Sequence, residues 1–214
     1  DATQVVSGFS GTVLPSMIMD GEAIVIQDNL STIGDVSVLS GTTTLSAGST
    51  MNTNGEILIS GGELHLDTEA TLRITENLRM TGGSLSASAA SDMYISGNLE
   101  HVGGLFQTNL AAIYFNGQKS QTALVSSSTT FSSFSVLLPS TSLSLISANE
   151  IVVTKQVRID ELASLTITEG GLNLVGAEPE SGLINNGTLV GSPSSVQFSG
   201  PIAESAVHSL SGSG

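Results

Sequence analysis

Three residues of one short segment, Glu63, His65 and Asp67, alternate with leucines and combine two carboxylates with an imidazole. Because side chains of a β-strand alternate between its two faces, a strand here would place all three on one face. Such a set could hold a divalent cation or transfer protons in acid–base catalysis. The positions 21 residues further on add no carboxylate or imidazole, since they are Ser84, Ser86 and Ser88. We therefore interpret the trio as the solvated face of a strand and predict no metal site or catalytic site there.

The densest acidic spots are Asp160-Glu161 and Glu178-Pro179-Glu180. Glycoside hydrolysis needs two acids that face one bond, whereas sequence neighbours on a strand point to opposite faces. Neither spot recurs one repeat away, and no Gly-x-Ser-x-Gly nucleophile motif has a plausible histidine partner. We therefore expect no enzyme, and we keep a polysaccharide-degrading β-helix enzyme as an alternative.

The chain has no cysteine, which excludes disulfides and thiolate metal sites. No calcium-binding nonapeptide or EF-hand spacing occurs, so we expect no cofactor, with structural calcium left as an open alternative. The run Thr42-Thr43-Thr44 suggests an ice-binding threonine array, but the equivalent outward sites one repeat later hold Glu63 and His65. Ice binding thus remains only a further alternative.

Charge and hydropathy restrict the partners of this chain of 214 residues. Its formal net charge of -14 argues against nucleic acid, whose phosphates require Lys and Arg. No apolar run approaches the length of a membrane span. The first residues, Asp1-Ala2-Thr3, indicate a mature end after processing, so we expect a secreted protein at the cell surface.

Glycine pairs mark an internal repeat. Gly61-Gly62, Gly82-Gly83 and Gly103-Gly104 are each 21 residues apart, and a fourth copy without the pair extends upstream to Val36. A constant period of this length is typical of stacked structural units that share one core.

The apolar positions of the repeat recur in columns spaced by two residues, which indicates strands. Three short strands per repeat would return the chain to its starting side, and the next repeat would stack on it. His101 falls in one of the columns, so we predict that it points inward. The predicted inward columns are Val36, Ile57, Leu78, Leu99; Val38, Ile59, Met80, His101; Thr43, Leu64, Leu85, Phe106; Leu45, Leu66, Ala87, Thr108; Met51, Leu72, Met93, Tyr114; and Thr53, Ile74, Ile95, Asn116.

These patterns predict an all-β fold, a single parallel β-solenoid of triangular section with about 21 residues per coil and essentially no α-helix. At 4.8 Å per coil, the chain would form on the order of ten coils and a rod roughly 50 Å long. An antiparallel sandwich is the competing fold. Within one domain, 1–214, we distinguish first coils (1–35), regular repeats (36–116), less regular coils (117–194) and a terminal open-edge segment (195–214).

A family resemblance begins where the repeat changes. The order Phe115-Asn116-Gly117, Gln121-Thr122, the segment 130–136 and the run 165–174 resembles the solenoid repeats of large secreted surface proteins of Bacteroidota-type bacteria. The resemblance covers roughly residues 103–200. It implies a spacer or stalk segment of an adhesin or surface fibre, without catalytic residues to transfer.

We therefore expect a structural subunit of an extracellular bacterial fibre or adhesin stalk. Open strand edges at the ends of a solenoid are templates for pairing, so we expect a homopolymer assembled head to tail. A module that binds surface glycans is the alternative. The residues expected at the assembly interface are Gln4, Val5, Val6, Phe9, Val196, Phe198, Ile202, Val207 and Leu210.

Overall fold

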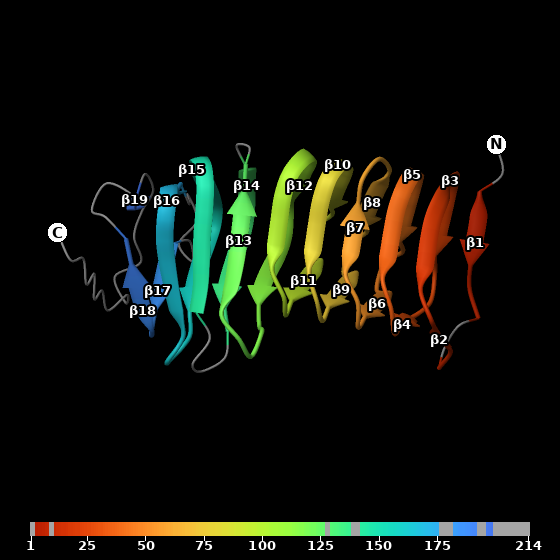
Figure 1. Cartoon of the computed structure of the whole chain (residues 1–214), viewed down its shortest axis with the longest axis horizontal. Helices are drawn as coiled ribbons and strands as arrows, with labels where there is room; N and C mark the ends of the chain where they lie inside the picture. Colours follow the sequence, from red (N-terminus) through yellow and green to blue (C-terminus); the bar gives the residue numbers. More distant parts are fainter. Residues whose placement is uncertain are drawn as a thin grey trace.

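The computed structural model of the chain describes residues 3–8, 11–126, 129–137, 142–175, 182–191 and 196–198. These residues form a β-solenoid of about eight turns, in which strands roughly 21 residues apart lie on one another (Figure 1). The first and last described strands, β1 (Gln4–Val6) and β19 (Val196–Phe198), lie at opposite ends of the rod. The described residues form no helix, so none of them belongs to a helix able to cross a membrane.

Nineteen strands make up the solenoid. The longer strands continue around a corner and contribute to two or three faces of the rod. In chain order the strands are β1 (Gln4–Val6), β2 (Val13–Leu14), β3 (Met17–Ile26), β4 (Leu30–Thr32), β5 (Val36–Leu45), β6 (Thr50–Thr53), β7 (Ile57–Ile59), β8 (Glu63–Leu66), β9 (Thr71–Ile74), β10 (Leu78–Ala87), β11 (Asp92–Ile95), β12 (Leu99–Phe115), β13 (Gln121–Val125), β14 (Thr129–Val136), β15 (Ser142–Ile159), β16 (Ser164–Leu174), β17 (Gly182–Asn185), β18 (Thr188–Val190) and β19 (Val196–Phe198).

Strand pairing divides the rod into three faces. The first face begins with the first half of β3 and continues through β5, β7 and β10 to β18. The second face begins with β1 and ends with β19, and the third begins with β2 and ends with β17. Every described strand pair is parallel, for example β5 with β7 and β6 with β9. The predicted parallel β-solenoid is therefore confirmed, and the antiparallel sandwich is excluded.

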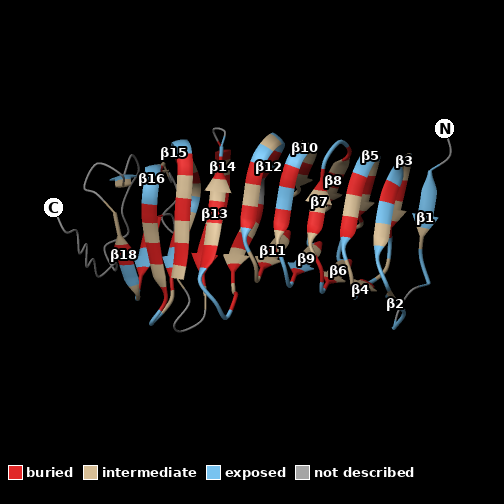
Figure 2. Ribbon diagram, in the orientation of Figure 1, coloured by how far each residue is buried: buried red, intermediate tan, exposed pale blue. Residues whose placement is uncertain are grey.

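The core is a set of stacked columns inside the rod. Val36, Ile57, Leu78 and Leu99 follow one another in register and are all almost completely buried, as predicted. Buried and partly exposed residues alternate along the strands (Figure 2). Burial of Val, Ile and Leu supplies the main driving force for this stacking.

The glycine pairs lie at the corner between the first and second faces. Gly83 has a φ of 65°, and a Cβ there would lie 2.1 Å from the carbonyl oxygen of Gly62. Gly41, one coil before Gly62, has the same φ and even less room. A side chain therefore cannot enter this corner without displacing backbone, which explains the recurring glycines.

A different corner, between the third face and the first face of the next coil, is held by side-chain amides and carboxylates. The backbone N–H of Glu56 donates to Oδ1 of Asp35 at 2.9 Å. Asn77 accepts in the same way from the N–H of Asn98, and Asn98 accepts from the N–H of Thr122. Asp35, Asn77 and Asn98 thereby tie their turns to the turn of the next coil.

The described residues form about eight turns, in line with the order of ten expected, and the later coils and their connections are longer than 21 residues. One prediction about regularity was wrong. On the third face, Met93 pairs with Ile113 and Ile95 with Phe115, so the fifth coil is one residue shorter there. Tyr114 and Asn116 were predicted to point inward, but Ile113 and Phe115 fill the core instead. The one-residue shift moves each side chain to the other face.

Candidate functional site

The acidic and imidazole side chains of β8 join a hydrogen-bonded row on the second face. Ser86 donates from Oγ to Oε1 of Glu63 at 2.7 Å, and Nδ1 of His65 lies 2.8 Å from the same Oγ. Because the serine has only one hydroxyl proton and a carboxylate only accepts, His65 is the donor to Ser86. The histidine therefore does not act as a base toward the serine.

Asp67 does not join this row. Its Oδ1 accepts a hydrogen bond from the backbone N–H of Thr68 at 2.7 Å and holds the turn after β8. Among the described residues, no three His, Asp or Glu side chains are grouped so as to bind a metal ion. The trio that the sequence singled out is thus distributed between a surface row and a turn.

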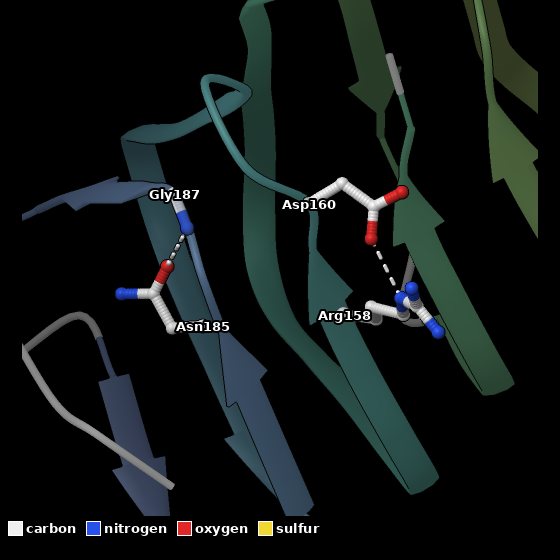
Figure 3. A network of polar contacts seen from close by, with 4 residues as sticks. All are labelled: Arg158, Asp160, Asn185 and Gly187. Carbon is white, nitrogen blue, oxygen red and sulfur yellow. Dashed lines mark hydrogen bonds and ion pairs between the residues drawn. The ribbon is translucent and has the colours of Figure 1, made fainter. Parts of the chain in front are cut away.

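The acidic pair Asp160-Glu161 lies at a corner after β15. Nε of Arg158 lies 2.6 Å from Oδ1 of Asp160, so this carboxylate is held by an ion pair (Figure 3). Glu161 follows in an exposed turn. At the corresponding corner of the next coil, the N–H of Gly187 donates to Oδ1 of Asn185 at 3.1 Å. Both arrangements shape turns; Glu178, Glu180 and His208 lie outside the described residues.

His101 points inward, as predicted, and is only 1% exposed. Its Nε2 lies 3.2 Å from the carbonyl oxygen of Gly104, which can only accept, so Nε2 carries a proton. Nδ1 has no hydrogen-bond partner. His101 therefore lies in the apolar core with one ring nitrogen unsatisfied.

An aromatic row on the third face was missed by the sequence analysis. The guanidinium carbon of Arg73 lies 4.0 Å from the centroid of the Tyr94 ring, and the rings of Tyr94 and Tyr114 stack with centroids 4.6 Å apart. Burial, followed by the negative charge of Asp92, raises the pKa of Tyr114 above its ordinary value. The row becomes visible in the sequence only if one coil is allowed to be 20 residues long.

The first strand of the rod leaves one edge open. β1 pairs with β3 and with no other described strand. The carbonyl oxygen of Val6 accepts a hydrogen bond from the N–H of Gln27 at 3.2 Å, so the backbone groups of Val6 face the rod. Backbone groups alternate in direction along a strand, and those of Val5 therefore face the open end. Of the other predicted interface residues here, Gln4 is exposed and Phe9 lies outside the described residues.

The other two faces begin in the same way. Leu14 accepts a hydrogen bond from the N–H of Ile33, and Met17 donates one to Asp35, which leaves the backbone groups of Val13 and Ile18 facing the open end. The side chains of Val5, Val13 and Ile18 are 54%, 54% and 69% exposed. The inward residues Val6, Leu14 and Met17 are only partly covered.

The opposite end carries three strands with one partner each among the described strands. β17 pairs with β15, and β18 and β19 both pair with β16. Of the interface residues predicted here, Val196 packs against the core, and Phe198 is the last residue of β19. The remaining three, Ile202, Val207 and Leu210, lie outside the described residues.

Comparisons with protein-family models, curated proteins and solved structures give no match to this chain.

Proposed function

We propose that this chain is a structural subunit of an extracellular bacterial fibre or adhesin stalk, and that copies stack head to tail through the ends of the solenoid. The observation that supports this function is the match between the two ends. Each end offers one strand per face whose outer edge has no partner among the described strands. Unpaired parallel edges are templates for further pairing.

The three faces define which strands would meet. Because the third face follows the second along each coil, the next copy would continue the coil after a rotation by one face, so that its β1 would pair with β17, its β2 with β18 and the first half of its β3 with β19. All three pairs would be parallel, as within the rod. Because the two surfaces in contact are different, the contact is heterologous and does not close, which generates a filament.

Apolar contacts at the joint favour the same arrangement. The partly covered side chains of Val6, Leu14 and Met17 continue the three core columns to the open end. A second copy would bury these three side chains, just as each coil inside the rod buries the apolar side chains of the coil next to it. Burial of apolar surface is favourable in proportion to the area removed from water.

The sides of the rod are suited to a fibre that stays hydrated. The net charge of -14 repels neighbouring rods. The chain is rich in Ser and Thr and has no cysteine, so assembly would not depend on disulfides. These features favour axial over lateral association.

Electron microscopy of the negatively stained 214-residue chain at rising concentration tests this function. We expect unbranched threads as wide as one rod, and aligned threads should diffract at about 4.8 Å along the fibre axis. Single short rods at every concentration would contradict the proposal. Threads with the 4.8 Å reflection perpendicular to their axis would contradict the end-to-end arrangement.

A further inference from the structure

A polar groove lies at the corner between the third face and the first face of the next coil. It has a volume of about 790 Å³ and crosses three successive coils, at residues 75–77, 96–98 and 116–121. Its lining consists only of polar residues and glycine. The volume is in the range of small-molecule sites, whereas the lining differs from the apolar walls that drug-like ligands prefer.

Three asparagines in the groove have their amide oxygens already engaged. Oδ1 of Asn77 accepts from the N–H of Asn98 at 2.9 Å, and Oδ1 of Asn98 accepts from the N–H of Thr122 at 2.8 Å. Oδ1 of Asn116 accepts from the hydroxyl of Ser96 at 3.0 Å. The Nδ2 groups of all three have no partner among the described residues. The groove therefore presents three oriented N–H₂ donors and favours a ligand rich in oxygen acceptors.

One cation lies in the groove, and a second lies on the strand that leads into it. Lys119 lines the groove, and Arg73 lies two residues before the lining residue Thr75. Neither has a carboxylate partner among the described residues, whereas Arg79 and Arg158 are each in an ion pair. Since the chain has only five basic residues and a net charge of -14, this placement favours an anionic group on the ligand.

The tyrosine row lies on strands β11 and β12, which lead into the groove. Tyr94 precedes Ser96 by two residues, and Tyr114 precedes Asn116 by two, so both rings lie on the same outer side as the groove. Both tyrosines are partly exposed. The two faces of the Tyr94 ring are covered by Arg73 and Tyr114, so the tyrosines offer a ligand their phenol hydroxyls, which can hydrogen-bond to the hydroxyl rim of a saccharide.

We propose that this groove binds an acidic saccharide. The asparagine N–H₂ groups donate to ring and hydroxyl oxygens, and Lys119 receives the carboxylate. Glu76 also lines the groove and repels a ligand charged at every unit. A saccharide in which uronate units alternate with neutral sugars fits this combination of one cation and one carboxylate. This site lies on the side of the rod and does not depend on end-to-end assembly.

The test is a calorimetric titration of the 214-residue chain with a hyaluronate hexasaccharide, in which glucuronate alternates with N-acetylglucosamine. Maltohexaose serves as the neutral comparison. Tyrosine fluorescence gives an independent readout, because the chain has no tryptophan and its two tyrosines both lie on strands that lead into the groove. We expect binding of the hyaluronate oligomer, a change in tyrosine emission, and at least about tenfold weaker binding of maltohexaose, the size of one charge-assisted contact.

Two matched pairs of variants locate the site. Asn98→Asp keeps the oxygen that accepts from Thr122 and replaces the N–H₂ donor by an anionic oxygen, and Asp35 shows that this corner accommodates an aspartate. We expect it to weaken hyaluronate binding about tenfold or more, while Asp35→Asn, at the same corner outside the groove, leaves the affinity unchanged. Lys119→Gln should also weaken binding, and Lys155→Gln, another exposed lysine without a described ion pair, should not.

Three results would overturn the proposal: no binding of the hyaluronate oligomer at millimolar concentration, equal binding of both oligosaccharides, or equal losses within either matched pair. Repeating the titration on the variant Val5→Pro, which is designed to block assembly, separates this proposal from the fibre. Saccharide binding by a monomer supports the groove even if no threads form.

Discussion

Thr43 lies directly over Leu64 in the same buried column, with its Oγ1 completely enclosed and without a hydrogen-bond partner. Its neighbour in the preceding coil, Ile24, is also apolar. The hydroxyl thus carries the cost of desolvation without a compensating bond. Of the run Thr42-Thr43-Thr44, only Thr43 is buried, as its place in the predicted column indicates.

Thr43→Val should stabilise the protein by about 1–2 kcal/mol, because it removes an unsatisfied hydroxyl and keeps the shape of the side chain. The measurement is the midpoint of urea unfolding followed by circular dichroism. Thr44→Val is the matched control, since Thr44 faces outward and is partly exposed, and it should change the midpoint little. A decrease in stability of Thr43→Val would contradict the assignment.

His101→Met should also raise the stability, by about 1 kcal/mol. The column continues from Met80 through His101 to Val125, so a methionine fits the chemistry of its neighbours and removes the unsatisfied Nδ1. The carbonyl of Gly104 loses its donor, but Gly104 is exposed and can bond to water. Thermal unfolding compares this variant with His65→Met on the outer face, which should not gain stability.

Tyr114 should ionise above the ordinary tyrosine pKa of 10.0, because burial and the charge of Asp92 disfavour its anion. The unfolded chain then releases the proton first, so stability is fully present below pH 10.0 and decreases as the pH rises through the folded pKa. Ultraviolet absorbance reports this titration. Asp92→Asn should lower the pKa of Tyr114, though not to the ordinary value, because burial remains; an unchanged titration curve would contradict the assigned role of Asp92.

Gly83→Ala should destabilise the protein by about 2–4 kcal/mol, because the residue combines a left-handed φ with contact against the Gly62 backbone. Gly21 lies at the same corner in the first coil, has ordinary φ and has open space around its Cβ position. Gly21→Ala is therefore the control, and its urea midpoint should match that of the unchanged chain. Equal effects of both substitutions would show that the corner does not require glycine.

The columns of β5, β7, β8 and β10 could be predicted because their spacing is a constant 21 residues and their residues are apolar at every second position. His101 was assigned inward for the same reason, although its chemistry is polar. Periodicity is sufficient to predict these columns because each coil stacks on the one before it, so that residues 21 positions apart occupy equivalent places.

Tyr114 shows where that reasoning fails. The shorter fifth coil preserves alternation along β12 but shifts its phase, and both Ile113-Phe115 and Tyr114-Asn116 are compatible with strand spacing. Only packing against Met93 and Ile95 selects the first set. The tyrosine row and the groove beside it therefore depended on a register that the sequence alone left ambiguous.

The variant Val5→Pro tests the end-to-end account most directly. Val5 has backbone groups that face the open end, so proline removes a donor needed by an incoming strand and leaves the hydrogen bond between Val6 and Gln27 in place. Val5→Thr keeps the donor and serves as the control. By sedimentation velocity, the unchanged chain and Val5→Thr should polymerise as concentration rises, and Val5→Pro should remain a monomer with the same circular dichroism spectrum. Polymerisation of Val5→Pro equal to that of the unchanged chain would contradict stacking through this edge.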